Sequence, residues 1–368
     1  MEKIKGNMKI IKVNLKERSY KILIGSGLLR NINDYIGQPG NMGKIMIITN
    51  PTVFSLYARG IETELRKKHK VTTAIVPDGE RAKSLKWAKF LYDAMVKEKM
   101  ERGSLVITVG GGVVGDLGGF VASTYMRGIP YVQVPTSLLA QVDSSIGGKV
   151  ALDHPLGKNL IGSFYQPKQV IIDSDVLKTL PEKEFKNGMA EIIKIAAIRD
   201  KELFSILEKK LGTISQDKAL LNKVIYRSCF HKAKIVEQDE KENSLRAILN
   251  YGHTIGHALE SLGKYHALTH GEAVLIGMFL AAEISCKTGV CKKDVMERQQ
   301  KLIRSIGLQG KKSSFPVKEV MEAMERDKKV KKGKIRFVLT KNIGSAILRD
   351  DVPGEIVSSV IRHFFRGF

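Results

Sequence analysis

The sequence predicts an α/β domain with a parallel sheet, followed by a mostly α-helical domain. Short apolar runs alternate with segments of helical periodicity in the first half of the chain, and this alternation is typical of a parallel sheet covered by helices on both faces. After Leu180 and Pro181 the periodicity is mostly helical. We therefore expect two domains, residues 1–181 and residues 182–368.

The expected strands of the first domain are short runs of apolar and β-branched residues. They are Lys44–Thr49, Val71–Val76, Ser104–Val109, Tyr131–Val134 and Gln169–Ile172, preceded by a hairpin of Met8–Leu15 and Tyr20–Ile24. The helices expected between them are Thr52–His69, Ser84–Met100 and Leu117–Ser123. Ligands of such sheets bind at the carboxyl ends of the strands, so functional residues are expected in the loops that follow the strands.

The second domain is expected to be built from helices with one small hairpin. The helices are Glu182–Arg199, Lys201–Leu211, Ala219–Glu240, Asn250–Leu262, Glu272–Lys287 and Val295–Ile306, with a last helix at Gly354–Phe365. The hairpin pairs Ile335–Thr340 with Ser345–Leu348 across a turn that contains Asn342 and Gly344.

The composition argues against several classes of protein. No apolar run approaches the roughly 20 residues of a membrane helix, and residues 1–5 lack the apolar core of a signal peptide. The three cysteines are too few for a disulfide framework, so we expect a cytoplasmic protein. The formal net charge of +23 suits nucleic acid or an acidic small substrate. No nucleic-acid-binding motif accompanies the lysines, so we expect the small substrate and neither nucleic acid nor a membrane as partner.

A glycine-rich turn follows the expected strand Ser104–Val109. Gly110, Gly112 and Gly115 match the pattern G-x-G-x-x-G between a strand and a helix, where bare backbone and a helix N-terminus favour a pyrophosphate. This pattern makes the first domain Rossmann-like, although no acidic residue lies about 20 positions further on. The alternative is a tight turn that only packs helix on strand. A second polar loop, Asp78–Lys83, is expected at the same edge, where its carboxylates would suit ribose hydroxyls.

Histidines cluster in the second domain. His253 and His257 lie four residues apart, on one face of a helix, and such pairs are a common foundation for zinc. A third ligand is needed, and His270 and Glu191 are both candidates. Spacing does not choose between His257 and His270, and the alternative is that these histidines are ordinary core or surface residues.

A third polar stretch combines glycines with cations. Asp143–Lys149 and Gly157–Gly162 place lysines, an asparagine and backbone amides close together in the sequence. With Arg127, Lys232 and Arg246 they supply the positive charge that an acidic, phosphorylated small substrate requires. Taken alone, either segment is better explained as an exposed loop.

The order and spacing of several segments resemble the 3-dehydroquinate synthase family along nearly the whole chain. The matching segments are Asp78–Lys83, Gly110–Asp116, Met126–Gly128, Pro135–Lys149, Gly157–Pro167, Leu177–Pro181, Gly188–Lys194, Leu249–Glu260 and His270–Ala273. The resemblance implies an NAD- and zinc- or cobalt-dependent homodimer that converts 3-deoxy-D-arabino-heptulosonate 7-phosphate to 3-dehydroquinate and phosphate. In that reaction NAD-mediated transient oxidation, phosphate elimination and reduction precede ring opening and intramolecular aldol closure.

The resemblance also implies residue roles. Metal ligands would be Glu191, His253 and His270. Residues against NAD would be Asp78, Gly79, Glu80, Lys83, Gly112, Val113, Gly115, Asp116, Thr136, Ser137, Lys158 and Thr179. Substrate contacts would be Arg127, Asp143, Lys149, Asn159, Lys194, Lys232, Arg246, Asn250 and His257, with Lys328 or Lys329. Within this group the catalytic residues would be Lys149, Lys194, Arg246, Asn250 and His257.

Two other enzyme classes fit part of the pattern. A related sugar-phosphate cyclase would act on sedoheptulose 7-phosphate or on an amino analogue of the shikimate precursor. A metal-dependent polyol dehydrogenase would share the glycine turn and the helical metal domain but needs no pocket for phosphate and carboxylate.

Overall fold

The structure is a computed structural model that describes residues 8–36, 43–263, 267–307, 315–330 and 335–366. The chain forms two compact units. Unit 1 comprises Met1–Phe185 with Lys232–Lys241, and unit 2 comprises Lys186–His231 with Glu242–Phe368. Each unit has its own elements and is described separately below.

Unit 1 is built on a seven-stranded sheet with the strand order β1-β2-β9-β6-β5-β3-β4. The strands are β1 (Lys9–Val13), β2 (Tyr20–Gly25), β3 (Ile45–Thr49), β4 (Val71–Ile75), β5 (Leu105–Gly110), β6 (Tyr131–Pro135) and β9 (Gln169–Asp173). Only the β1–β2 pair is antiparallel, and the other five pairings are parallel. The predicted parallel sheet and its leading hairpin are confirmed.

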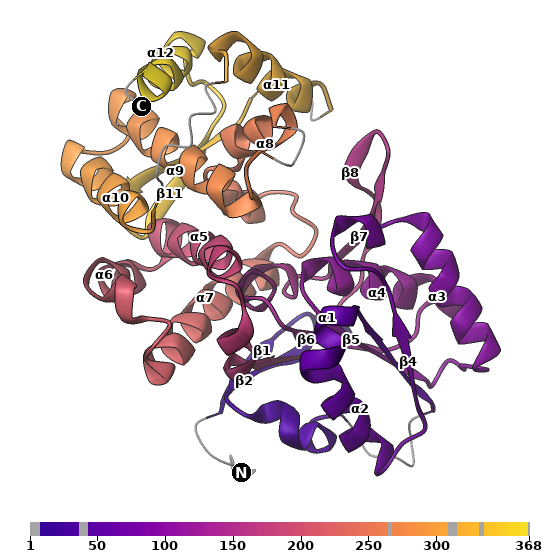
Figure 1. Ribbon diagram of the computed structural model, residues 1–368. Coiled ribbons are helices and arrows are strands. Elements are labelled where there is room, and N and C mark those ends of the chain that lie inside the picture. The colour runs from indigo at the N-terminus through magenta and orange to yellow at the C-terminus, as the bar shows by residue number, and fades with distance from the viewer. Residues whose placement is uncertain (1–7, 37–42, 264–266, 308–314, 331–334, 367–368) are drawn as a thin grey trace. The chain divides into compact units, whose positions relative to one another are not determined.

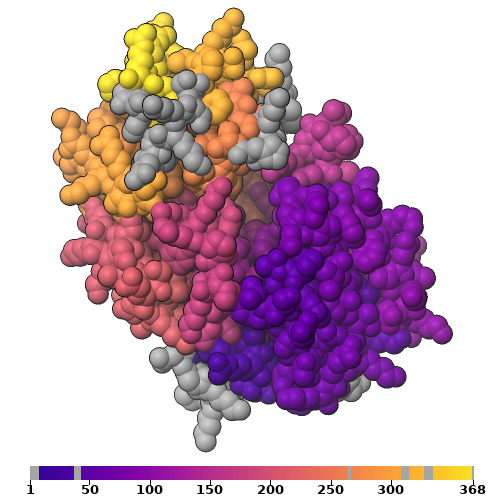
Figure 2. Space-filling view, in the orientation of Figure 1, coloured from indigo at the N-terminus to yellow at the C-terminus, as the bar shows by residue number. Residues whose placement is uncertain are grey.

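The central strands are buried because both faces of the sheet are covered. All residues of β3 are buried, and successive side chains point to opposite faces. Met46 and Ile48 join a core with helices α3 (Leu85–Lys97) and α4 (Gly112–Thr124), whereas Ile45 and Ile47 join a second core. Residues of α2 (Arg59–Arg66) line that second core. Figure 2 shows this indigo-to-purple part of the chain as a closely packed body.

The structure differs from the expectations for unit 1 at two helices and a pair of loops. The expected helix Thr52–His69 is a continuous run of α1 (Pro51–Val53), the π-helical η4 (Phe54–Ala58) and α2. Helix α4 begins five residues earlier than expected, within the glycine turn. Of the two expected polar loops, Asp143–Lys149 runs from the end of the π-helix η7 (Ala140–Ser144) to the start of β7 (Lys149–His154), and Gly157–Gly162 lies in β8 (Gly157–Phe164), which pairs with β7 as a hairpin. A Cβ at Gly162 would lie 2.5 Å from the Val150 carbonyl oxygen, so glycine permits this close pairing.

Unit 2 is mostly helical, as predicted. Its helices include α6 (Lys201–Lys210), α8 (His253–Leu262), α9 (His270–Lys287), α10 (Lys293–Ser305), α11 (Val317–Val330) and α12 (Gly354–Arg366). Helices α5 (Glu182–Arg199) and α7 (Lys218–Gln238) each include residues of both units. The predicted hairpin is present as β10 (Phe337–Asn342) and β11 (Ser345–Arg349), whereas α11 was not expected.

Glycines allow α8 and α9 to pack side by side, as Figure 1 shows. A Cβ at Gly277 would lie 1.8 Å from the Gly252 carbonyl oxygen, so only glycine fits there. Gly252 has a left-handed φ of 79°, and for this reason α8 begins at His253 and not at Asn250 as expected. Helix α9 begins at His270, two residues before the expected start, because Thr269 and Glu272 form a capping box. Within the described residues, every helix is too short or too polar to cross a membrane.

Candidate active site

The glycine turn of unit 1 lies at the carboxyl end of β5. Gly111 is the N-cap residue of α4, so the first backbone amides of the helix face this edge of the sheet. The three glycines of the pattern, Gly110, Gly112 and Gly115, do not adopt positive φ. They are needed instead because neighbouring atoms lie close to their Cα atoms. An added Cβ would lie 2.6 Å from Val114 Cβ at Gly110, 2.9 Å from Gln133 Oε1 at Gly115, and 3.1 Å from Ser144 Oγ at Gly112.

Charged side chains converge beside this turn. The Lys83 ammonium lies 2.7 Å from Asp116 Oδ2 and hydrogen-bonds Asn159 Oδ1. Burial alone would lower the pKa of Lys83, but Asp116 outweighs it and the pKa is raised. Burial raises the pKa of Asp116 to about 6 in spite of Lys83. Lys158 Nζ lies 3.3 Å from Glu80 Oε1, so the Asp78–Lys83 loop, α4 and β8 meet at one place in unit 1.

Hydroxyl groups from neighbouring strand ends complete this edge. Thr136 follows β6 and donates its backbone N–H to the Gly110 carbonyl at 2.9 Å. Ser137 Oγ lies 3.6 Å from the position of a Cβ on Gly111. Thr179 ends the 3₁₀ helix η8 (Ser174–Thr179), which follows β9, and its hydroxyl hydrogen-bonds Tyr57 Oη. The residues expected against NAD therefore follow β4, β5, β6 and β9, except Lys158, which lies in β8.

The sequence analysis missed three polar residues near this edge. Thr52 Oγ1 donates to Asp78 Oδ2 at 3.1 Å, and the Asn50 side chain caps α1 by accepting from the Val53 amide. Tyr57 bonds Thr179 as described above. Asn50 directly follows β3 at its carboxyl end, and that position was a signal available in the sequence.

The candidate substrate residues of unit 1 fall in several places. Lys232 Nζ donates to Asp143 Oδ1 at 2.5 Å and to the Asp143 carbonyl oxygen at 2.7 Å. Two of the expected substrate contacts therefore bond each other. Lys149 is exposed at the start of β7. Arg127 is exposed, has a left-handed φ of 67°, and forms no ion pair with any residue that the structure describes.

In unit 2, one carboxylate and two imidazoles converge. Glu191 comes from α5, His253 is the first residue of α8, and His270 is the first residue of α9. Glu191 Oε1 lies 3.7 Å from His253 Nε2 and 3.5 Å from His270 Nε2. One ligand atom from each residue lies within 4.8 Å of the others. His257, Glu260 and His270 form a second such group, in which His257 is exposed.

Hydrogen bonds and charge prepare the buried group as a metal site. His253 Nδ1 lies 3.1 Å from the Tyr251 carbonyl, so with the proton on Nδ1 the ring presents a free Nε2 lone pair toward Glu191. Burial, followed by the charge of Lys194, holds the pKa of His253 well below its usual range, which keeps the imidazole neutral. Both carboxylate oxygens of Glu191 are buried, and in the described part of the chain Oε2 is ion-paired with Lys194 while neither oxygen accepts a hydrogen bond of normal geometry. These donors fit a divalent ion such as zinc or cobalt.

Lys194 and His270 complete the electrostatics of this group. Burial alone would raise the pKa of Glu191, but its ion pair with Lys194 and the two histidines hold that pKa well below its usual range. His270 Nδ1 lies 3.4 Å from Glu260 Oε1. Burial alone would lower the pKa of His270, but Glu191 and Glu260 raise it to about 10.

The remaining candidate residues of unit 2 precede α8 or end α11. Arg246 and Asn250 belong to the 3₁₀ helix η10 (Leu245–Asn250), where Arg246 is only 2% exposed. Asn250 Nδ2 donates to Glu242 Oε1 at 3.0 Å. Lys328 and Lys329 lie in α11, but their side chains fall outside the described residues.

The fold and these sites define a class: enzymes that combine a nucleotide-binding α/β unit with a helical metal-binding unit. Two solved structures of this class match 96% of the chain with TM-scores of 0.87. One is 2-deoxy-scyllo-inosose synthase, 24% identical over 100% of that chain and complexed with carbaglucose-6-phosphate, NAD+ and Co2+. The other is 2-epi-5-epi-valiolone synthase from Streptomyces hygroscopicus subsp. jinggangensis 5008, 26% identical over 99% of that chain, with NAD+ and Zn2+ bound.

Sequence comparison defines the family within this class. The family model for the 3-dehydroquinate synthase N-terminal part matches residues 73–187, and the model for the C-terminal part matches residues 188–330. The chain belongs to the 3-dehydroquinate synthase family. It is 48% identical to the 3-dehydroquinate synthase of Rippkaea orientalis (strain PCC 8801 / RF-1), over 96% of this chain and 98% of that protein. It is 46% identical to the 3-dehydroquinate synthase of Nostoc punctiforme (strain ATCC 29133 / PCC 73102), over 96% and 99% respectively.

Proposed function

We propose that this protein is a 3-dehydroquinate synthase, a lyase of the shikimate pathway of aromatic amino-acid biosynthesis. Its substrate is 3-deoxy-D-arabino-heptulosonate 7-phosphate and its products are 3-dehydroquinate and phosphate. The observation that carries this proposal is the 46–48% identity, over 96% of the chain, to proteins with that name. Related cyclases share the fold at 24–26% identity.

We assign the carboxyl edge of the unit 1 sheet to NAD, which supplies an acceptor and donor of hydride for one substrate carbon. Amides at the α4 N-terminus suit the pyrophosphate, and the carboxylates of Asp78 and Glu80 suit ribose hydroxyls. Lys83 and Asp116 position each other through their ion pair. The other residues in this assignment are Gly79, Gly112, Val113, Gly115, Thr136, Ser137, Lys158 and Thr179.

We assign Glu191, His253 and His270 to a divalent ion, zinc or cobalt, which supplies a Lewis acid for substrate hydroxyls. The Tyr251 carbonyl fixes the orientation of the His253 ring, and Glu260 does the same for His270. We expect about one ion per chain, loss of activity on chelation and recovery with zinc or cobalt. Normal metal content and turnover in His253→Ala would rule out this ligand set.

The remaining cations and amides are assigned to the substrate. Buried cations pair with the carboxylate and phosphate, which would otherwise be costly to desolvate. Lys149, Lys194 and His257 stabilise charge and handle protons, and Arg246 and Asn250 orient the substrate. The other residues in this assignment are Arg127, Asp143, Asn159 and Lys232, with Lys328 or Lys329.

Substrate preference tests this proposal against the rival cyclase. The acid substrate has a carboxylate at C1 that sedoheptulose 7-phosphate lacks, and charge-assisted contacts contribute roughly 1.5–3 kcal/mol each. With sedoheptulose 7-phosphate as the substrate, the buried Arg246 guanidinium would lose its contact with the C1 carboxylate. We expect a preference of about 100-fold or more in kcat/KM for the acid, measured by phosphate release. Arg246→Ala should narrow the preference, and comparable turnover of both sugars by the wild type would favour the rival cyclase.

We also propose domain limits and a cellular setting. The two proposed domains are residues 1–181 and 182–368. This boundary lies close to residues 185–188, where the compact units and the two family models divide. The protein is proposed to be a cytoplasmic homodimer that binds neither nucleic acid nor membranes. Light scattering on the purified chain tests the dimer.

A further inference from the structure

A basic pocket lies at the amino-terminal edge of the unit 1 sheet, opposite the edge assigned to the nucleotide. Lys70 precedes β4, Lys44 precedes β3 and Ser104 precedes β5. The Ile45 amide bonds the Lys70 carbonyl and the Leu105 amide bonds the Lys44 carbonyl, so these three strand entries lie side by side. The pocket has a volume of about 350 Å³, and its lining residues are Gly43, Lys44, Lys68, His69, Lys70, Lys99, Glu101 and Ser104.

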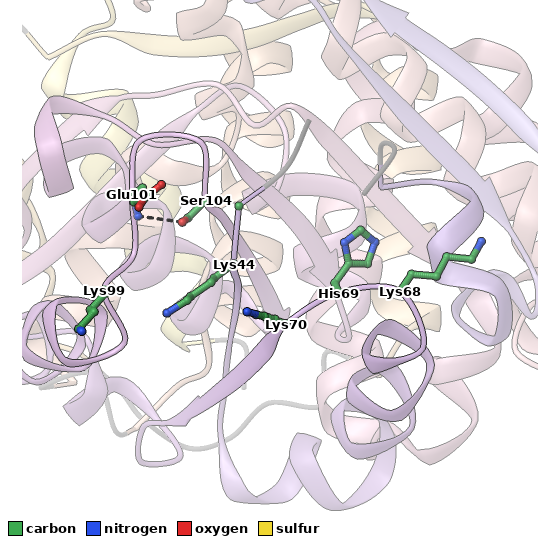
Figure 3. A pocket seen from close by; sticks show the side chains of 8 residues that line it. Lys44, Lys68, His69, Lys70, Lys99, Glu101 and Ser104 are labelled. Carbon is green, nitrogen blue, oxygen red and sulfur yellow. Dashed lines mark hydrogen bonds between the residues drawn. The ribbon is translucent and has the colours of Figure 1, made fainter. Parts of the chain in front are cut away.

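The lining carries uncompensated positive charge. It includes four lysines and a single carboxylate, that of Glu101. Among the residues that the structure describes, no carboxylate lies within 4.0 Å of the ammonium group of any of these lysines. Lys44 is held by a hydrogen bond from Nζ to the Glu98 carbonyl at 2.5 Å. Figure 3 shows the Lys44 and Lys70 side chains pointing in the same direction, whereas the Lys68 side chain points away from them.

Two further features of the lining are unusual for a solvated surface. His69 Nε2 is buried and has no hydrogen-bond partner in the described structure, and such orphaned polar atoms are rare. Lys99 has a left-handed φ of 51° at the end of α3. The amides of Lys99 and Met100 bond the carbonyls of Val96 and Met95, a helix ending that normally uses glycine. A lysine at this position is unfavourable for the backbone, yet it places a charge at the pocket.

We propose that this pocket binds a small polyanion that carries two or more phosphate or carboxylate groups. Lysine ammonium groups act as point charges for such oxyanions, and several of them together suit a ligand with more than one anionic group. The volume lies at the lower end of the range for small-ligand sites, and the concave lining between strand entries suits a compact ligand. The proposal does not depend on the catalytic assignment, because all of its residues lie at the opposite ends of the strands.

Calorimetry with tripolyphosphate tests the site on the full-length protein saturated with NAD. The double variant Lys70→Gln with Lys99→Gly removes two pocket charges, and glycine suits the backbone at position 99. We expect about tenfold weaker binding per lysine, or loss of one binding site, with turnover of the sugar phosphate unchanged. The matched control is Lys12→Gln with Lys21→Gln, which removes two exposed lysines that face each other across β1 and β2. Its binding should stay within about twofold of the wild type.

A tungstate soak of crystals of the full-length protein locates the anion directly. We expect anomalous density between Lys44, Lys70 and Lys99. Density confined to the carboxyl edge of the sheet, together with equal tripolyphosphate binding by the pocket variant and the wild type, would overturn the proposal. A competition experiment uses a short DNA duplex. If the duplex displaces tripolyphosphate, binds the wild type more tightly than tripolyphosphate does, and binds the pocket variant more weakly, the site binds a polymer and not a small anion.

Discussion

The two candidate sites of this chain are built by different means. The nucleotide edge of unit 1 uses backbone amides, glycines and short polar loops that follow successive strands. The metal group of unit 2 uses three buried or half-buried side chains from α5, α8 and α9, supported by Lys194 and Glu260. We therefore expect the site in unit 1 to tolerate many side-chain changes if the backbone path is kept, whereas the site in unit 2 should be sensitive to the loss of a single charge.

The largest expected effect is at Glu191. Glu191→Gln removes the carboxylate ligand and leaves Lys194 without its ion-pair partner in a buried site. We expect metal affinity and activity to fall by more than about 100-fold, and the metal-free protein to lose about 3–5 kcal/mol of stability. Metal content and chemical denaturation measure the two effects. The comparison variant is Glu260→Gln: Glu260 contacts the outer nitrogen of His270, Nδ1, and its replacement should cost about 10–100-fold in metal affinity.

The next effect concerns pH and Asp116. Its pKa in the folded protein is raised from 3.8 to about 6, so the folded state holds this proton more tightly than the unfolded state. Asp116 therefore adds about 2–3 kcal/mol to the free energy of unfolding below pH 3.8, and this contribution is lost as the pH rises through 6. Asp116→Asn removes this titration. The difference in stability between wild type and variant should fall between about pH 4 and 6.5, followed by the fluorescence of Trp87, the single tryptophan. A difference that stays constant with pH would contradict the assignment.

A pair of glycine variants separates packing from ligand approach in unit 1. Gly110→Ala places a Cβ 2.6 Å from Val114 Cβ, so we expect a loss of about 1–3 kcal/mol in stability. Gly112→Ala meets only the Ser144 hydroxyl at 3.1 Å, which can move, so stability should change by less than about 1 kcal/mol while NAD binding weakens. Chemical denaturation measures the stability of both variants, and titration measures their affinity for NAD. If Gly112→Ala loses NAD affinity only in proportion to its loss of stability, as Gly110→Ala does, the turn has only a packing role.

The smallest effect is at Lys99. Lys99→Gly relieves a left-handed residue at the end of α3 and should stabilise unit 1 by about 0.5–1 kcal/mol. Lys97→Gly, in the last turn of the same helix, is the matched control and should destabilise by a similar amount. Trp87 lies in the same helix, so its fluorescence reports both changes during denaturation. A loss of stability in Lys99→Gly would contradict this explanation.

Periodicity predicted most of the fold, because buried strands and amphipathic helices need a regular apolar pattern. The strands of the seven-stranded sheet and the late hairpin follow the expected runs closely, whereas β7 and β8 were expected as loops. Helix starts were less predictable, since they depend on local conformation: the left-handed Gly252 delays α8, and the Thr269 capping box advances α9. The helix Val317–Val330 was missed because charged residues interrupt its short apolar pattern.

The candidate site was predictable only in part from local sequence. His253 and His257 are adjacent on one helix and were found by spacing, but Glu191 lies 62 positions before His253 and joins it only through packing of α5 on the later helices. The residues alone left His257, His270 and Glu191 as candidate ligands, and the resemblance to the family chose Glu191 and His270 among them. Thr52 and Tyr57 were missed because their hydrogen bonds to Asp78 and Thr179 come from segments distant in sequence.

A redox-neutral elimination of phosphate distinguishes the proposed function from that of a polyol dehydrogenase. The most direct measurement uses the heptulosonate substrate carrying deuterium at C5, with phosphate, NADH absorbance and isotope content followed in one reaction. We expect NAD-dependent release of phosphate, no net accumulation of NADH, and deuterium retained at C5 of the product. Formation of NADH in proportion to turnover, without release of phosphate, would contradict the account and identify a polyol dehydrogenase.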